Sequence, residues 1–181
     1  PVTKEQRAMA KVINFGVIYG MGPYNLSQQL NIPMEQAKEY IDAYFNRYTG
    51  ITRYFERIRN DLAEKHYVEN LFGRRRYFAD ITNMNKRDQD SIFRMAINTP
   101  IQGTAADLIK VAMISIAETI KKEKLASKMI LQIHDELVFE VPEGEKAHME
   151  KLIRQKMESA YALKVPLLVD IKAALNWADA H

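Results

Sequence analysis

The sequence contains no cysteine, which excludes disulfide bonds and thiolate-ligated zinc or iron–sulfur sites. It has no apolar run of the roughly 18 residues that a membrane span requires, and it does not open with a signal peptide. Internal repeats, low-complexity tracts and linkers are also absent. We therefore expect a cytoplasmic protein without a membrane partner, in keeping with the reducing conditions of that compartment.

The composition is that of an ordinary globular protein, with 181 residues of which 47% are hydrophobic and 27% charged. This length predicts one domain, or one domain and a fragment of another. The formal charge is +3, and its distribution is uneven: residues 1–90 hold 14 Lys/Arg against 11 Asp/Glu, whereas residues 91–181 hold 12 of each. The basic excess of the first half favours a polyanion as its partner.

Two apolar, β-branched runs flank His134-Asp135-Glu136, a pattern that predicts a β-hairpin over residues 128–142. Aspartate tolerates left-handed backbone, so the turn can form at His134-Asp135 without glycine. The tip then carries the carboxylates of Asp135 and Glu136. Because Mg²⁺ binds through one or two carboxylates together with substrate phosphates, the tip is a candidate metal site. Alternatively, Asp135 only forms the turn and its neighbours are solvated.

A capping-box signature at Thr3 and Gln6 predicts a helix that runs to about Tyr19, with Gly20 as its stop. Side chains that recur every four residues share one slowly winding face of this helix: Arg7, Lys11, Phe15 and Tyr19. One interpretation is a phosphate clamp continued by a stacking platform for a nucleotide. The other is an amphipathic surface helix with a buried aromatic end.

Aromatic stripes at helical spacing follow, and we interpret them as core. They predict a short helix over residues 24–30, a helix that begins at Pro33 and ends at Thr49-Gly50, and a further helix from Ile51. Residues 67–78 then predict a small β-ribbon whose tip is basic, Gly73-Arg74-Arg75-Arg76. This tip is either ordinary surface or a contact for nucleic-acid backbone.

The next helix, from about Lys86, carries Arg94 and Asn98, and Gln102 continues the four-residue step beyond an expected break or kink at Pro100. A guanidinium and two amides in a row suit base edges or sugars. They equally suit the bracing of a helix junction.

The second half predicts a long helix that opens with Thr104 and Asp107, then the hairpin, a helix over residues 145–162, and a final strand over residues 166–175 beside the hairpin. Helices combined with antiparallel ribbons make the fold class α+β.

The motifs occur in a fixed order: Arg7-x₃-Lys11-x₃-Phe15-x₃-Tyr19-Gly20, then Arg94-x₃-Asn98-x₃-Gln102-Gly103-Thr104-Ala105-Ala106-Asp107, then His134-Asp135-Glu136. Together they resemble the C-terminal part of family A DNA polymerases, of the bacterial DNA polymerase I type. The resemblance covers essentially the whole chain, down to Asn176-Trp177. It implies a helical fingers subdomain at residues 1–93 and the C-terminal part of an antiparallel-sheet palm at residues 94–181.

The resemblance also implies DNA-templated DNA synthesis in replication or repair, with primer–template DNA, dNTP and two Mg²⁺ ions. On the first helix, Arg7 and Lys11 would hold the triphosphate, Phe15 the sugar and base, and Tyr19 would border the templating base. Lys11 would also protonate the leaving pyrophosphate.

In the palm, the resemblance implies that Arg94, Asn98 and Gln102 touch the primer–template near the minor groove. His134 would contact the primer terminus. Asp135 would be a ligand of the catalytic Mg²⁺ ions, with Glu136 in support.

One departure from the family pattern concerns the metal site. The family bridges its two ions with a second aspartate on a palm strand that precedes the fingers. Nothing like that strand precedes Arg7, and the remaining aspartates lack its setting: Asp80, Asp88, Asp90, Asp107 and Asp170. We therefore expect a fragment that needs the missing N-terminal polymerase segment as its partner and is inactive alone.

Three alternatives remain open. A non-catalytic nucleic-acid-binding module would bind DNA without turnover. A metal-dependent phosphohydrolase would use the His134-Asp135 pair, but its further ligands are not supplied by the other histidines, His66, His148 and His181. A phage-type RNA polymerase shares the general plan.

Overall fold

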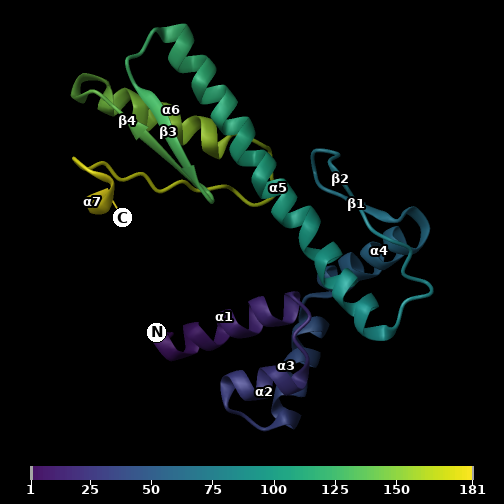
Figure 1. Cartoon of the computed structure of the whole chain (residues 1–181). Coiled ribbons are helices and arrows are strands. Elements are labelled where there is room, and N and C mark those ends of the chain that lie inside the picture. The colour runs from purple at the N-terminus through teal and green to yellow at the C-terminus, as the bar shows by residue number, and fades with distance from the viewer. Residues whose placement is uncertain (1, 181) are drawn as a thin grey trace. The chain divides into compact units, whose positions relative to one another are not determined.

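The computed structural model describes residues 2–180, which form two compact units divided between Gln102 and Gly103. The predicted α+β class is confirmed, since helices combine with two antiparallel two-stranded ribbons in this part of the chain (Figure 1). None of the helices within residues 2–180 has the length and hydropathy of a membrane span. The elements of the first unit are α1 (Lys4–Ile18), α2 (Pro23–Leu30), α3 (Met34–Arg47), α4 (Thr49–Lys65), β1 (Tyr67–Glu69) and β2 (Arg75–Tyr77).

Helix α1 is closed at both ends by the expected residues. The Thr3 hydroxyl accepts from the Gln6 N–H at 3.2 Å, and the Gln6 side chain accepts from the Thr3 N–H at 3.0 Å. At the other end Gly20 adopts φ +81°, so that its N–H donates to Val17 O and the Met21 N–H donates to Gly16 O. This is a Schellman motif, which needs a left-handed residue and therefore favours glycine.

The helix predicted to begin at Pro33 does not end at Thr49-Gly50, so this predicted boundary is wrong. Helix α3 ends at Arg47, and α4 begins at Thr49, so Thr49 and Gly50 form the first turn of the next helix. The N–H groups of a first turn have no intrahelical acceptors, so a glycine at this frayed end costs less than one in a helix interior. The predicted inward face of this helix is confirmed, since Ala37 and Tyr44 of α3 are buried.

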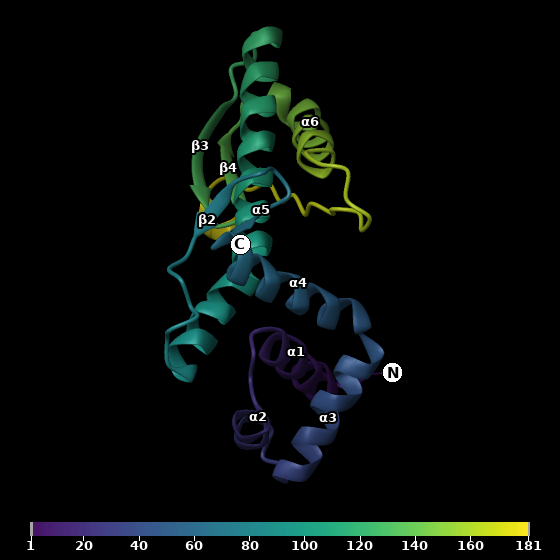
Figure 2. The same cartoon turned by 90° about the vertical axis from the view of Figure 1, so that its right-hand side faces the viewer.

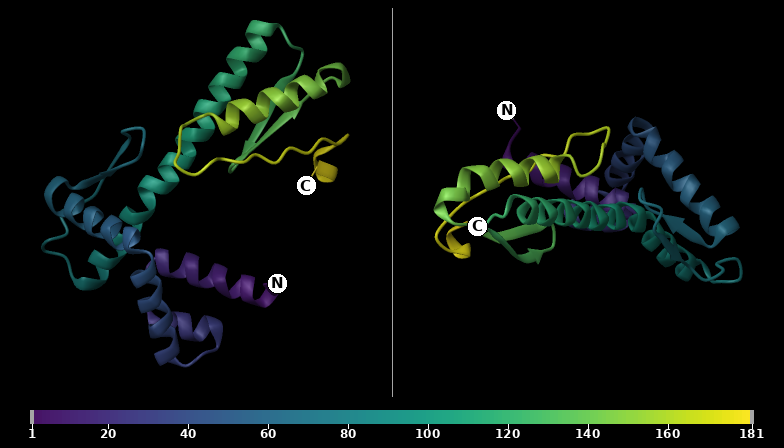
Figure 3. Two further views of the ribbon diagram at one scale, coloured as in Figure 1. Left: turned by 180° about the vertical axis from the view of Figure 1, so that it is seen from behind. Right: turned by 90° about the horizontal axis from the view of Figure 1, so that it is seen from above.

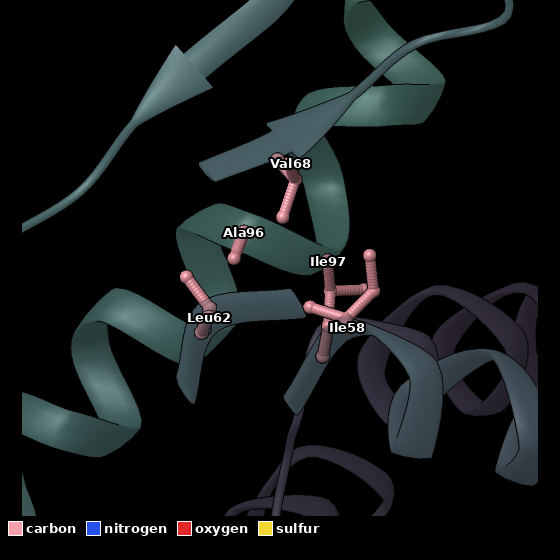
Figure 4. Packing of buried hydrophobic residues seen from close by; sticks show 5 residues of the cluster. All are labelled: Ile58, Leu62, Val68, Ala96 and Ile97. Carbon is pink, nitrogen blue, oxygen red and sulfur yellow. The ribbon is translucent and has the colours of Figure 1, made fainter. Parts of the chain in front are cut away.

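The core of the first unit joins α4, β1 and the start of α5 (Lys86–Glu123). Figure 4 shows its five buried members, Ile58, Leu62, Val68, Ala96 and Ile97, facing one another from these three elements. The strands β1 and β2 pair antiparallel with Tyr67 opposite Tyr77, which confirms the predicted ribbon. Burial of large apolar side chains from three elements fixes the start of α5 on α4.

Helix α5 is continuous through Pro100, which corrects the predicted break and the separate helix start at Thr104. Proline cannot donate to the carbonyl four residues earlier, and an interior proline costs about 3 kcal/mol. Side chains reinforce the preceding turn: the Tyr54 hydroxyl donates to Ile97 O at 2.6 Å, and the Thr99 hydroxyl donates to Met95 O at 2.8 Å. These bonds and the burial of Ile97 hold the helical path.

The second unit contains the C-terminal part of α5, the hairpin of β3 (Lys128–Ile133) and β4 (Glu136–Glu140), a 3₁₀ turn η1 (Glu143–Glu145), α6 (Lys146–Glu158) and the short α7 (Trp177–Ala180). Within it, α5 lies along α6 and the hairpin (Figure 2). Its buried members are Ile116 of α5 and Met149, Leu152 and Ile153 of α6, with Met129, Leu137 and Phe139 of the hairpin packed against them. The hairpin over residues 128–142 is confirmed, with an irregularity between Met129 and Leu131.

The end of the chain differs from prediction. Helix α6 ends at Glu158 rather than at residue 162, and the predicted strand over residues 166–175 does not form (Figure 3). A strand needs a partner for its backbone groups. Here side chains of α6 bind the backbone groups of Val169 instead of a partner strand. The Val169 N–H donates to Glu158 Oε1 at 3.1 Å, and Arg154 donates to Val169 O.

Candidate functional site

The four predicted side chains, three on α1 and one at its C-cap Tyr19, are all exposed and share one face. Phe15 is 60% exposed and Tyr19 is 40% exposed, so the alternative of a buried aromatic end is wrong. Their rings lie nearly parallel, with an interplanar angle of 10° and 6.4 Å between centroids. Two large aromatic rings that stack on each other and remain open to solvent form a surface on which a further flat ring can stack.

A cavity of about 680 Å³ opens beside this face, within the first unit. It is lined by Lys11 and Phe15 of α1, by Tyr19 at the C-cap of this helix, and by Arg94 of α5. The structure therefore brings together three predicted residues of the first motif and one of the second. Arg7 lies one turn before Lys11 on the same helix but is not part of the lining. A volume of this size suits a small organic ligand.

Asn25 and Gln29 of α2 also line this cavity, and neither amide was predicted to be a site residue from the sequence. Because they are four residues apart, they share one face of that helix, and this spacing is visible in the sequence. The direction of this face depends on how α2 packs against α1, and local spacing does not contain that information.

The cations of this region are not neutralised by the chain itself. Arg7, Lys11 and Arg94 make no ion pair or hydrogen bond with any side chain of the described residues. By contrast, Lys65 pairs with Asp61 at 2.7 Å, and Arg75 pairs with Glu69 at 2.8 Å. Unpaired cations beside an open cavity attract anions such as phosphate groups.

Asn98 and Gln102, the remaining amides of the second motif, lie apart from the cavity lining. Gln102 is exposed, whereas the Asn98 Oδ1 is buried and has no hydrogen-bond partner within residues 2–180. A buried acceptor without a partner is uncommon and costs roughly 1–3 kcal/mol. The predicted role of both amides stays a prediction.

The turn of the hairpin in the second unit carries the predicted carboxylates. His134, Asp135 and Glu136 are all exposed, and the Gln132 side chain donates to His134 O at 3.1 Å across the turn. The left-handed residue is His134, with φ +52°, and not Asp135 as predicted. Histidine is among the residues for which this conformation is enriched.

The donor set of this turn fits Mg²⁺, because two neighbouring exposed carboxylates offer hard oxygen ligands and leave other positions to water and substrate phosphates. Residues 2–180 contain no group of three or more His, Asp or Glu side chains placed to hold a metal ion. Asp135 and Glu136 by themselves do not make such a group, and the predicted metal role of Asp135 stays a prediction.

Nearly the whole chain is similar to bacterial DNA polymerases. DNA polymerase I of Bacillus caldotenax is 45% identical over 179 residues, and DNA polymerase I of Caldicellulosiruptor bescii is 42% identical over 178 residues. These alignments cover 99% and 98% of this chain but only 20% and 21% of the relatives. The chain thus spans about a fifth of the length of the curated relatives it matches.

Among solved structures, the POL domain of Pol1 from M. smegmatis, in complex with DNA primer-template and dNTP, is 41% identical with a TM-score of 0.92. The match covers 99% of this chain and 32% of that one. The sequence model of DNA polymerase family A matches residues 1–179. By this match, which spans nearly its full length, the chain belongs to DNA polymerase family A.

Proposed function

We propose that the chain is part of a DNA-directed DNA polymerase, which transfers nucleotides from dNTP to the 3′ end of a primer under the direction of a DNA template. The observation that carries this proposal is the stacked, exposed pair Phe15 and Tyr19 beside unpaired cations at one open cavity. Stacking surfaces and unpaired cations are the two features that bind a base and its phosphates. The similar polymerase domain in complex with primer-template and dNTP supports the same partners.

On α1, Arg7 and Lys11 hold the triphosphate of the incoming nucleotide, and Phe15 packs on its sugar and base. Tyr19 borders the templating base. Lys11 also donates a proton to the leaving pyrophosphate, which a lysine ammonium beside the cavity can supply. Residues 1–93 correspond to the fingers, and residues 94–181 to the C-terminal part of the palm.

Primer–template DNA is contacted by Arg94, Asn98 and Gln102 near the minor groove and by His134 at the primer terminus. A guanidinium and amides recur on α5 in steps of four residues and so follow one side of the helix. Arginine and amide side chains donate hydrogen bonds to base edges and sugars.

Asp135 is a metal ligand and Glu136 supports it. Mg²⁺ ions bound there would stabilise the charge that develops on the reacting oxygens. Because the chain spans about a fifth of its relatives, we propose that the second bridging carboxylate lies in a further segment of the polymerase, which acts as the chain's partner. Asp135 lies in the two-residue turn that joins the paired strands β3 and β4, so its backbone is at the end of a paired ribbon.

The test is primer extension by the polymerase polypeptide that carries this segment, with Asp135→Asn and the matched change Glu140→Gln at the other end of the hairpin. We expect Asp135→Asn to lower kcat by at least about 10³-fold with little change in DNA affinity, since metal stabilisation acts in the transition state. Glu140→Gln should leave kcat within about twofold.

Near-normal turnover of Asp135→Asn would mean that Asp135 is not a metal ligand and only forms the turn. DNA binding without any incorporation by the unmodified polypeptide would favour a non-catalytic binding module instead.

A further inference from the structure

The end of α1 touches a side chain from far along the sequence. A Cβ atom built on Gly20 would lie 3.3 Å from Arg94 Cγ and 3.4 Å from Arg94 Cδ. Because these separations are at or just below ordinary van der Waals contact, the aliphatic stem of Arg94 lies directly against the space that a side chain at position 20 would need. Both residues belong to the first unit and both line the cavity.

This close approach restricts the space in which the Arg94 stem can lie. Arg94 is exposed, and among residues 2–180 its guanidinium has no hydrogen bond or ion pair that would hold it in place. A long unpaired side chain on a helix surface samples many rotamers, and packing of its methylene groups restricts them. With no side chain at position 20, the Arg94 stem can lie close to the end of α1.

Gly20 also has an independent reason to be glycine, because it closes the Schellman motif with φ +81°. Gly20 thus has two effects. It ends α1 beside the Phe15–Tyr19 pair, and it leaves room for the Arg94 stem at that end of the cavity. The two consequences can be separated by experiment, since Gly73 has nearly the same backbone, φ +78°, with nothing within 4 Å of its Cβ position.

We propose that Gly20 is a positioning residue for nucleic-acid binding: its missing side chain lets the stem of Arg94 pack on the end of α1 and fixes the guanidinium at the cavity, where it meets the primer–template. This proposal rests on the proposed function of Arg94. A methyl group at position 20 requires the stem to shift by a few tenths of an ångström, which moves the guanidinium from its place at the cavity.

The test is a double-mutant cycle in the polymerase polypeptide that carries this segment, with a fluorescent primer–template as the probe. Gly20→Ala should raise the Kd for primer–template by about tenfold over Gly73→Ala, which carries the same backbone strain without the contact. In an Arg94→Ala background, Gly20→Ala should add no more than about twofold. The slope of log Kd against log salt should fall equally in Gly20→Ala and Arg94→Ala, because both remove one cationic contact.

Equal losses in Gly20→Ala and Gly73→Ala overturn the proposal, as does a Gly20→Ala loss that persists in full without the arginine. If Gly20→Ala does not fold, Gly20→Asn replaces it, because asparagine tolerates the left-handed backbone and still adds the Cβ. If Arg94→Ala alone leaves primer–template affinity unchanged, the Gly20 proposal is overturned, whereas loss of incorporation in Asp135→Asn would still support the proposed function.

Discussion

The rings of Phe15 and Tyr19 stack on each other one helical turn apart, with 6.4 Å between centroids and an angle of 10°. Aromatic residues usually dominate a core, yet Phe15 is 60% exposed and Tyr19 40% exposed, and both border a cavity. The two rings therefore do not contribute to the interior of the first unit. Their position indicates that they are available to a ligand.

Removing the first of these rings should weaken nucleotide binding. Stacking of a base on an aromatic side chain contributes about 1–3 kcal/mol, so Phe15→Ala should raise the KM for dNTP by about 5- to 150-fold. Steady-state primer extension measures this change. The control is Tyr24→Ala, an aromatic residue of α2 that is 65% exposed but does not line the cavity. Equal effects of the two substitutions would contradict a stacking role for Phe15.

Lys11 should bind the nucleotide rather than DNA. A charge-assisted hydrogen bond to phosphate contributes roughly 1.5–3 kcal/mol, so Lys11→Ala should lower the efficiency of nucleotide incorporation by about 10- to 150-fold. Primer–template affinity, measured by fluorescence anisotropy, should change far less. Lys38→Ala, an exposed lysine of α3 outside the cavity, is the matched control. An equal loss in DNA binding would mean that Lys11 is part of a general basic surface.

The face of α1 could be predicted because it depends on local spacing alone. Residues four apart share one side of any helix, and the capping residues Thr3 and Gly20 are visible in the sequence. The hairpin could be predicted for the same reason, since apolar runs and a polar turn determine it locally. The position of Arg94 beside Gly20 was not, because it results from the packing of helices distant in the sequence.

The errors have the same physical origin. Pro100 predicts a break when only the helix itself is considered, but the hydroxyl of Tyr54, from another helix, reinforces the turn that the proline weakens. Residues 166–175 have the composition of a strand, yet a strand exists only where a partner strand pairs with it. In this chain α6 side chains bond to Val169 instead.

The bond between Tyr54 and α5 should stabilise the first unit. Burial raises the pKa of Tyr54 to about 12, although the nearby Arg57 lowers it, so the hydroxyl remains a proton donor at neutral pH. Tyr54→Phe removes this donor at the turn before Pro100 and should lower the free energy of unfolding by about 1–3 kcal/mol. Urea denaturation measures the change. Tyr48→Phe, at a residue that is 50% exposed, should change stability by less than about 0.5 kcal/mol, and a loss as large as that of Tyr54→Phe would contradict the proposed brace.

Glu145 should make the second unit sensitive to acid. Its carboxylate accepts hydrogen bonds from the Ser127 hydroxyl, from the Ala126 N–H at 2.8 Å and from the Ser127 N–H at 2.9 Å, immediately before β3 begins. The Ser127 hydroxyl and then the Ala126 N–H hold the pKa of Glu145 below its ordinary value of 4.5. Because the folded state favours the ionised form, this group stabilises the fold above the ordinary pKa, and the stabilisation is lost as pH falls through the lowered value.

Glu145→Gln should therefore unfold at a lower urea concentration than the unmodified chain at pH 7, because an amide cannot accept all three bonds. The difference between the two proteins should begin to shrink below about pH 4.5, where only the unmodified chain loses its carboxylate. Glu143→Gln, an exposed carboxylate of the same 3₁₀ turn, is the control and should change stability little at any pH. A difference between Glu145→Gln and the unmodified chain that stays constant from pH 7 to pH 3 would mean that the charge of Glu145 does not stabilise the connection into β3.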